Sequence, residues 1–434
     1  MVHKNFAMRL NPFLLVLLLL PFLTSAQAPP PTLPALPLYS SSRWILDSNN
    51  ARIKLRCVNW AGHLEPNIPE GLNHQPLDAI VDWIASQGFN CVRLTYSTDL
   101  ALTGHKTLVS DSFAAAAREW SRPSLYDPLF TDDILRHNPW IDAKSTTTLS
   151  VFSAVISKLY DSGILTILDN HVSKASWCCN VTDGNGWWDE AFGYNPFNSR
   201  FFNTSAWMAG LSSMASFSLS LPGVVGMSLR NELRAFLLQD LNAHQDWYDF
   251  LQEAGTLVHS VNPSLLVVIG GVQSATDLVH LKAVKPFDAS AWADKRVWEM
   301  HAYSFTLTFP DPFKSCDLVK LSYGAFSGFV LEQGKSWTGP LILSEFGVGM
   351  QGGEAQYDGL NEKDNRYLNC LVDYMTGNDA DWAVWALQGS YYIRDGQVDY
   401  DETWGLLKHD WSEWRNEKFA ARLGKMWNVT QGPS

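Results

Sequence analysis

The chain has 434 residues, of which 46% are hydrophobic, and its 32 basic and 44 acidic residues give a net charge of −12. This acidic balance excludes nucleic acid and anionic membrane surfaces as favoured partners. The length and the hydrophobic content suffice for one large domain of barrel type. The 19 tryptophans are an unusual number and suit sugar binding, because flat indole rings stack against the apolar faces of pyranosides.

The N-terminus, residues 1–28, has the pattern of a signal peptide. Lys4 and Arg9 give it a positive start, residues 13–23 form an apolar core, and small residues follow as a cleavage site. Residues 29–40 are rich in proline and are predicted to be an extended linker outside the fold. No later stretch approaches ~18 uncharged apolar residues, so no membrane span is expected. We therefore expect a secreted, extracellular protein.

Sequons and cysteines fit this secretory route. Sequons also arise by chance, but three of them lead us to expect a glycoprotein; their asparagines are Asn180, Asn203 and Asn428. Six cysteines permit 15 disulfide pairings, which the sequence leaves open. Cys178 and Cys179 are adjacent and are expected to bond to different partners, whereas Cys91 lies in an apolar run and is interpreted as a buried free thiol. No paired Cys or His spacing indicates a zinc site.

From residue 43 onward, β-rich apolar runs alternate with helical patterns, which is typical of repeated βα units. The predicted strands are Lys54–Asn59, Cys91–Thr95, Leu165–Asp169, Val224–Leu229, Leu266–Gly270, Val297–Met300, Leu341–Ser344 and Ala383–Leu387. The predicted helices are Pro76–Gln87, Leu149–Asp161, Ser199–Ser216, Trp247–Val261, Glu362–Thr376 and Trp411–Leu423. Eight such units predict an α/β fold, a (β/α)8 TIM barrel with its active site at the carboxyl ends of the strands.

Other segments complete one predicted domain, residues 41–424. Arg43–Asp47 is predicted to form a short hairpin at the bottom of the barrel, and residues 425–434 a polar, loosely held tail. Two connections, Leu100–Lys144 and Val172–Asn198, are much longer than ordinary βα loops and are expected to wall a cleft. The tryptophans that they carry are Trp120, Trp140, Trp177, Trp187 and Trp188.

Two of the apolar runs end at a glutamate: residues 225–231 precede Glu232, and residues 341–344 precede Glu345. A carboxylate at the end of a buried strand is held rigidly where a barrel presents its chemistry. Either one alone would be interpreted as a solvated strand-end charge. As a pair they can divide the roles of general acid/base and nucleophile in the cleavage of a glycosidic bond.

Polar and aromatic residues recur at the other strand ends as well. Only the fifth strand, which ends in Gly270 and Gly271, offers no side chain that could take part in catalysis or binding. The residues at the remaining ends are Asn59, Trp60, Arg93, Tyr96, Asp169, Asn170, His171, Asn231, His301, Tyr303 and Trp385. This set is typical of a catalytic face rather than of random loops.

Six short motifs occur in chain order: Arg-Cys-Val-Asn-Trp, Asn-Cys-Val-Arg-Leu, Leu-Asp-Asn-His, Arg-Asn-Glu, His-Ala-Tyr and Ser-Glu-Phe-Gly. Together they resemble the cellulase family, glycoside hydrolase family five of clan A. Each motif alone is weak, but six of them in order, spread over residues 43–423, form a specific signal. The resemblance implies a retaining mechanism with Glu232 as acid/base and Glu345 as nucleophile. Leu233 replaces a proline that many members carry, which argues against transferring a precise substrate.

Elementary chemistry suggests partners for the two glutamates. Their pKa values must differ, so that one is protonated while the other is charged. Arg93 is predicted to lie near Glu345 and keep it ionised, although an arginine that only braces the barrel is an alternative. The hydroxyl of Tyr303 can donate to the same carboxylate.

The resemblance implies roles for four more residues. The asparagine at position 231 would bond the 2-hydroxyl of the sugar, although a structural asparagine is the alternative. His171 and His301 would line the subsite next to the cleaved bond, where an isolated histidine would be interpreted as a core residue. Trp385 would form the floor beneath the sugar ring.

The predicted activity is that of an endo-β-1,4-glucanase, or cellulase, acting on a polysaccharide or oligosaccharide. Mannan, mixed β-glucan and small β-glucosides remain close alternatives, because a fold does not determine a substrate. A carbohydrate-binding pseudoenzyme and a transglycosylase are the rival functions. We expect a monomer without metal or organic cofactor, since two carboxylates and water suffice. The sequence leaves open endo or exo action and the presence of a binding module in longer relatives.

Overall fold

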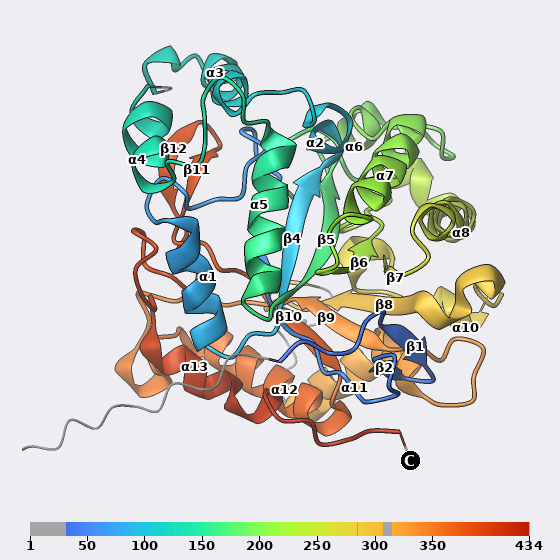
Figure 1. Ribbon diagram of the computed structural model, residues 1–434. Coiled ribbons are helices and arrows are strands. Elements are labelled where there is room, and N and C mark those ends of the chain that lie inside the picture. Colours follow the sequence, from blue (N-terminus) through green and yellow to red (C-terminus); the bar gives the residue numbers. More distant parts are fainter. Residues whose placement is uncertain (1–31, 126, 284, 307–314, 434) are drawn as a thin grey trace, which may run out of the picture.

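The computed structural model of the protein describes residues 32–433, except residues 126, 284 and 307–314. Eight parallel strands close into a barrel in the order β10-β3-β4-β5-β6-β7-β8-β9, with helices on the outside (Figure 1). This confirms the predicted (β/α)8 barrel. The barrel strands are β3 (Arg56–Trp60), β4 (Cys91–Ser97), β5 (Leu165–Val172), β6 (Val224–Ser228), β7 (Leu266–Gly270), β8 (Arg296–His301), β9 (Leu341–Glu345) and β10 (Asp381–Val384).

Each barrel strand overlaps one predicted strand, and β7 has the predicted bounds. The strands are buried on both faces because helices cover the barrel outside and side chains fill its interior, which is why the sequence shows continuous apolar runs. Ring closure occurs where β10 pairs with β3, at Ala383 opposite Cys57, and with β9, at Trp382 opposite Leu343. The closed ring brings the ends of sequence-distant strands together on one rim.

The outer helices follow amphipathic stretches. In α5, for example, the side chain of Thr147 accepts a hydrogen bond from the backbone of Ser150 as an N-cap, and one face packs on the barrel. The helices are α1 (Leu77–Ser86), α2 (Thr98–Thr103), α3 (Val109–Glu119), α4 (Leu135–His137), α5 (Thr148–Asp161), α6 (Pro196–Ser199), α7 (Thr204–Ser218), α8 (Ala243–Val261), α9 (Val272–Ala275), α10 (His280–Ala283), α11 (Cys316–Phe326), α12 (Glu362–Asn378) and α13 (Glu417–Leu423). Within the described part of the chain, none of them has the length and apolar character needed to cross a membrane.

A short hairpin closes the bottom of the barrel, as predicted. It pairs β1 (Tyr39–Ser41) with β2 (Trp44–Leu46). Leu38 and Ile45 are fully buried against the interior residues at the amino ends of the strands. The predicted linker, residues 29–40, is therefore wrong at its C-terminal end, because burial of Leu38 makes this segment part of the fold. The predicted signal peptide lies outside the described residues.

The C-terminal segment also differs from its prediction. Helix α13 is shorter than the predicted Trp411–Leu423, because Asn416 caps it by accepting a hydrogen bond from Lys418 N. The tail is not loosely held. Its Trp427 packs on Trp382 at 5.1 Å between ring centroids, and Gln431 N donates to Asp379. Contacts with the bottom of the barrel thus hold the C-terminal segment, which the sequence analysis expected to be loosely held.

All six cysteines are paired, and two of the predictions about them are wrong. Cys91 is bonded to Cys57 across the neighbouring strands β4 and β3, because their register places the two side by side. Cys178 and Cys179 are bonded to each other. The third disulfide joins Cys316 of α11 to Cys370 of α12.

Candidate active site

A cavity of about 350 Å³ lies at the carboxyl ends of the barrel strands. Most barrel strands contribute to it through their last residue or the loop that follows. The residues that line it are His171, Trp177, Cys178, Cys179, Asn231, Glu232, Tyr303, Phe305, Glu345, Trp385, Arg394, Tyr400, Glu402, Thr403 and Trp404. Six of the eight predicted site residues are among them; Arg93 and His301 lie beneath the floor instead, with 1% and 0% of their surfaces exposed.

The two glutamates meet across one histidine. Nδ1 of His301 lies 3.0 Å from Oε1 of Glu232 and 3.6 Å from Oε2 of Glu345. One oxygen of each carboxylate and the imidazole nitrogen all lie within 4.8 Å of one another. The predicted proximity of the two carboxylates is therefore confirmed. A pair at this spacing can place a nucleophile and an acid on one glycosidic bond, as retaining hydrolysis requires at about 5–5.5 Å.

Arg93 is a cation at the centre of the barrel. Its Nη1 donates to Oε1 of Glu345 at 2.8 Å and to Oδ1 of Asn59 at 3.0 Å. Its Nη2 donates to Oδ1 of Asn231 at 3.0 Å and lies 2.9 Å from Asp169. Arg93 thus lies next to Glu345, as predicted, and its charge opposes the effect of burial on the pKa of that carboxyl. Its other contacts brace the barrel, so the two interpretations offered for it hold together.

Two buried acids in this network were not chosen as site residues. Asp169 ends the predicted third strand, and Glu299 lies inside β8 with its carboxylate 3.7 Å from Arg93 and within hydrogen-bond reach of Ser228. Burial raises the pKa of both carboxyls, and the charge of Arg93 opposes the rise. An acidic residue inside an apolar strand at an inward position was the signal that could have identified Glu299.

The titration of the central groups is coupled. Burial lowers the pKa of His301, but the charges of Glu345 and Glu232 outweigh burial and hold it above its usual value. Burial raises the pKa of Glu232, yet the hydrogen bond and charge of His301 outweigh it and bring that pKa below its usual value. Burial raises the pKa of Glu345, and His301 and Arg93 offset only part of the rise. Glu232, His301 and Glu345 therefore titrate as one coupled system rather than as independent groups.

Tyr303 completes the surroundings of Glu345. Its hydroxyl donates to Oε2 of Glu345 at 3.0 Å, as predicted. Burial and the neighbouring carboxylates raise the pKa of this phenol well above its usual value, so it stays a donor. With Arg93 on one oxygen and Tyr303 on the other, Glu345 is fixed in one orientation. Such fixation favours a nucleophile that must attack along one line.

The backbone at Glu232 is held in a sparsely populated conformation. Its φ is 41°, in the left-handed region that glycine prefers. Arg234 stabilises this turn, because its Nη1 donates to the carbonyl oxygen of Glu232 at 2.7 Å and its Nη2 binds Asp183 at 3.0 Å. The backbone N–H of Ser274, in the short helix α9 after β7, donates to the carbonyl oxygen of Leu233, the residue after Glu232, at 3.0 Å. Contacts from the segments after β5 and β7 thus hold the turn that carries Glu232.

His171 and Trp385 form one stacked wall. Their rings lie 5.4 Å apart with an interplanar angle of 17°. Nδ1 of His171 hydrogen-bonds Asp169 at 2.6 Å, and its Nε2 faces Nδ2 of Asn231 at 3.4 Å. Burial, together with the charge of Arg93, holds the pKa of His171 well below its usual value, so the ring is neutral. A neutral imidazole of this kind can accept or donate a hydrogen bond but brings no charge to a ligand.

The long connections wall the cavity only in part. The first is not a plain loop, because the helices α2, α3 and α4 lie within it, and neither Trp120 nor Trp140 lines the cavity. In the second, Trp177 lines the cavity as expected. Trp187 and Trp188 are fully buried and belong to the hydrophobic core.

A second wall was missed by the sequence analysis. It is the hairpin of β11 (Ser390–Arg394) and β12 (Gln397–Asp401), which follows β10 and is visible beside the barrel in Figure 1. The guanidinium of Arg394 lies 3.5 Å from the ring centroid of Trp177 and pairs with Glu402 at 2.9 Å. The dipeptide Asp395-Gly396 between two short β-rich runs was a hairpin signal that could have revealed it.

Among the residues that the structure describes, three groups of side chains have donor atoms close enough to hold a metal ion. They are His171 with Cys178 and Cys179, His74 with Asp399 and His409, and Glu232 with His301 and Glu345. In the first group the disulfide occupies both sulfurs. In the third, Arg93 and Tyr303 already bind Glu345, so this group suits acid–base chemistry rather than a cation site.

Comparison with known proteins gives consistent matches. The family model described as cellulase (glycosyl hydrolase family 5) matches residues 47–390. A glycosyl hydrolase 5 family protein of Chamaecyparis obtusa is 38% identical over 409 residues, which cover 92% of this chain and 67% of the relative. An endoglucanase of Paenibacillus polymyxa is 23% identical and covers 86% of this chain and 83% of its own length.

Solved structures share the barrel. The catalytic domain of the major endoglucanase from Xanthomonas campestris pv. campestris matches 90% of this chain and 99% of its own, with 19% identity and a TM-score of 0.67. A variant of an endocellulase from Pyrococcus horikoshii in complex with cellotetraose matches 92% of this chain and 100% of its own, again with 19% identity and a TM-score of 0.67. At this identity the likeness establishes the fold.

Proposed function

The chain belongs to glycosyl hydrolase family 5, the cellulase family, and is a glycoside hydrolase; from this premise we propose that it cleaves β-linked glycans with retention of anomeric configuration. Glu345 is the nucleophile and Glu232 the acid/base. The observation that carries this proposal is the approach of the two carboxylates to within 4.8 Å, at the edge of the cavity and around one buried histidine.

In the first step, an oxygen of Glu345 attacks the anomeric carbon while the bond from that carbon to the leaving oxygen breaks. The leaving oxygen takes a proton from the Glu232–His301 pair. Arg93 and Tyr303 keep Glu345 ionised and oriented until the covalent bond forms. The product of this step is a glycosyl-enzyme ester and a shortened glycan with a free hydroxyl group.

In the second step, water attacks the anomeric carbon from the side that the leaving group vacated. Glu232 takes one proton from that water, and the ester bond to Glu345 breaks, so the carboxylate is restored. Asn231 supports both steps by hydrogen-bonding the 2-hydroxyl. His171 and Trp385 provide a polar edge and an apolar floor for the same sugar ring.

We assign β-1,4-glucan as the leading substrate, because relatives that match 86% and 90% of this chain are named endoglucanases. β-Mannan is the second candidate. The test is a screen of carboxymethylcellulose, mannan, mixed-linkage glucan and cello-oligosaccharides, with NMR of the first product formed. Initial release of the β-anomer supports the proposal, and initial release of the α-anomer contradicts it.

The same screen separates the rival functions. A carbohydrate-binding pseudoenzyme would bind cello-oligosaccharides without releasing any product. A transglycosylase would give longer products when acceptor sugar is raised, whereas a hydrolase gives shortened products at all acceptor concentrations. The intact set of Glu232, Glu345, Arg93 and Tyr303 favours hydrolysis over binding alone.

We further propose that the protein is secreted and glycosylated. Residues 1–28 carry the signal-peptide pattern, and the three sequon asparagines, Asn180, Asn203 and Asn428, are all exposed. One relative is named a major extracellular endoglucanase. Secretion of the native chain from eukaryotic cells, with a mass shift after deglycosylation, tests both points.

The pH dependence of kcat/KM is expected to be bell-shaped. On the acid side, activity is lost when Glu345 is protonated, and its raised pKa places that limb above the range of an ordinary glutamate. On the basic side, activity is lost when the Glu232–His301 pair releases its proton, and the raised pKa of His301 places that limb above the range of an ordinary histidine. In His301→Gln the acid limb should move to higher pH, because the charge that lowers the pKa of Glu345 is gone. An unchanged acid limb, measured with an aryl β-cellobioside, would contradict this coupling.

A further inference from the structure

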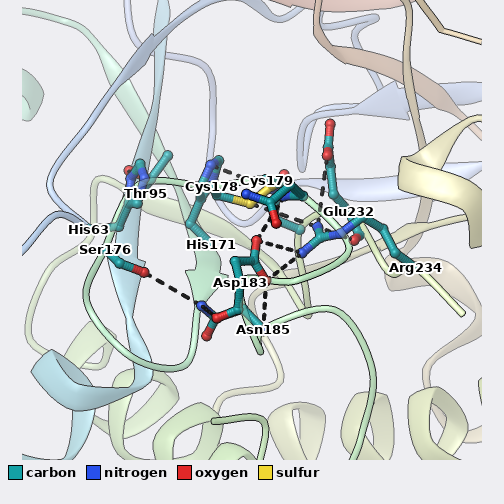
Figure 2. Close-up of a disulfide and its surroundings, with 12 residues drawn as sticks. His63, Thr95, His171, Ser176, Cys178, Cys179, Asp183, Asn185, Glu232 and Arg234 are labelled. Atoms are coloured by element: carbon teal, nitrogen blue, oxygen red, sulfur yellow. Dashed lines mark hydrogen bonds and ion pairs between the residues drawn. A yellow bond between two sulfur atoms is a disulfide. The ribbon is translucent and has the colours of Figure 1, made fainter. Parts of the chain in front are cut away.

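The disulfide between Cys178 and Cys179 has no part in the chemistry above, yet both of its residues line the cavity. It lies in the segment after β5, next to His171 and close to Glu232 (Figure 2). Cys178 is 8% exposed and Cys179 is half-buried at the cavity surface. A sulfur–sulfur bond is thus part of the wall that a bound sugar would face.

The usual stabilising effect of a disulfide on the unfolded chain does not explain why this disulfide is present. The stabilisation that a disulfide gives by restricting the unfolded chain grows with the length of the loop that it closes. Cys57–Cys91 and Cys316–Cys370 are separated by 34 and 54 residues, whereas Cys178 and Cys179 are neighbours. The neighbouring pair restricts almost nothing beyond itself, so its contribution must be sought in its local contacts.

The first local contact is with Asn231. Its Nδ2 lies 3.7 Å from Sγ of Cys178 and 3.6 Å from Sγ of Cys179. Its Oδ1 accepts from Arg93. The amide is therefore held at both ends, with its oxygen toward the cation and its NH2 group toward the sulfurs and the sugar side. Reduction of the disulfide would alter these contacts and allow the side-chain amide of Asn231, which is proposed to bind the 2-hydroxyl of the sugar, to change its orientation.

The second contact is with Arg234. Its Nη1 lies 3.8 Å from Sγ of Cys178 and donates to the carbonyl oxygen of Glu232. Its Nη2 binds Asp183, which belongs to the same segment as the disulfide (Figure 2). The disulfide segment and the turn that carries Glu232 are thus joined through one guanidinium. A displacement of Cys178 would therefore shift Arg234 and, through it, the backbone of Glu232.

We propose that the Cys178–Cys179 disulfide is a positioning element of the active site, which orients Asn231 and Arg234, so that hydrolysis depends on its oxidised state. This inference rests on the proposed function. Reduction by a phosphine breaks the sulfur–sulfur bond and gives two thiols, while the phosphine takes oxygen from one water molecule and becomes a phosphine oxide. A dithiol reductant would instead reduce the bond by thiol–disulfide exchange and would itself be oxidised to a disulfide.

The disulfides differ in access to a reductant. Cys57 and Cys91 are fully buried between two barrel strands. Cys316 and Cys370 lie on α11 and α12, outside the barrel. Brief treatment with tris(2-carboxyethyl)phosphine should therefore reach the cavity pair while the barrel pair stays intact, and mass spectrometry of alkylated peptides identifies which cysteines were reduced.

We expect selective reduction to lower kcat on an aryl β-cellobioside at least ~10-fold while KM changes less than about threefold, since a positioning defect acts on the transition state. In samples in which the alkylated peptides show Cys316–Cys370 intact, the melting temperature should stay close to that of the oxidised protein. The basic limb of the pH profile should move upward, because Arg234 contributes to the low pKa of Glu232. Reoxidation with glutathione disulfide should restore kcat.

Two double variants make the test specific. Cys178→Ser with Cys179→Ser should reproduce the loss of kcat and make the enzyme insensitive to the phosphine. The matched control, Cys316→Ser with Cys370→Ser, should lower the melting temperature, keep kcat and keep the sensitivity to phosphine. Wild-type kcat in the first variant, or a phosphine effect that survives in it, would overturn the proposal.

Cellotetraose binding by calorimetry separates this proposal from the proposed function. If the wild-type chain hydrolyses no glycan but binds cellotetraose, the proposed function fails. The positioning role is then supported by weaker binding to the Cys178→Ser, Cys179→Ser variant and refuted by equal binding. A wild-type chain that neither hydrolyses nor binds overturns both proposals.

Discussion

Replacement of Glu345 by alanine is expected to lower kcat/KM by about 10⁴-fold or more, because no other group can form the covalent intermediate. Such a loss equals about 5.5 kcal/mol of transition-state stabilisation. Folding should be preserved, since Arg93 keeps Asp169 and Asn59 as partners in the variant. Turnover of an aryl β-cellobioside and the melting temperature measure the two effects separately.

Added azide sharpens this result. In Glu345→Ala, azide can occupy the space of the missing carboxylate and attack the anomeric carbon, which gives an α-glycosyl azide. Glu253→Ala is a suitable control, because Glu253 is an exposed residue of α8. Near wild-type turnover in Glu345→Ala, or a fall of the same size in Glu253→Ala, would refute the nucleophile assignment.

Replacement of Glu232 by alanine should affect substrates according to their leaving groups. Natural glycans need a proton on the leaving oxygen, so their kcat/KM should fall by ~10²–10⁴-fold. A dinitrophenyl β-cellobioside needs no such proton, and its kcat/KM, which reports the first step, should fall by less than about tenfold. Parallel measurement of the dinitrophenyl substrate and cellotetraose tests the difference.

The azide product again identifies the role. In Glu232→Ala, azide attacks the glycosyl-enzyme from the side that water uses, so the product is a β-glycosyl azide. The opposite anomers from the two variants would distinguish acid/base from nucleophile without reference to rate. Equal losses on both substrates, or an α-azide from Glu232→Ala, would contradict the assignment.

The parts of the fold that the sequence predicted are those governed by hydrophobic pattern. Fully buried strands such as Leu266–Gly270 are continuous apolar runs, so their bounds could be read almost to the residue. Closure of the ring then determines that Glu232 and Glu345 share a rim, since both end inward-facing runs. The contacts of Glu345 with Arg93 and Tyr303 follow from the same geometry.

Features that depend on tertiary contacts could not be predicted from the sequence. The pairing of Cys91 with Cys57 depends on strand register, and the burial of Leu38 depends on the open bottom of the barrel. His301 was expected to line a subsite, but the register shift at the end of β8 places it beneath the two carboxylates. Arg394 reaches the cavity only because a hairpin follows the last barrel strand and returns to it.

The most direct test of the central claim, that Glu345 attacks the sugar while Glu232 supplies the proton, is mass spectrometry of a trapped intermediate. The protein is incubated with 2,4-dinitrophenyl 2-deoxy-2-fluoro-β-cellobioside, digested, and its peptides are sequenced. The account predicts one fluorocellobiosyl ester, on Glu345. An ester on Glu232 or any other residue, or no ester in a preparation that hydrolyses the unfluorinated substrate, would contradict it.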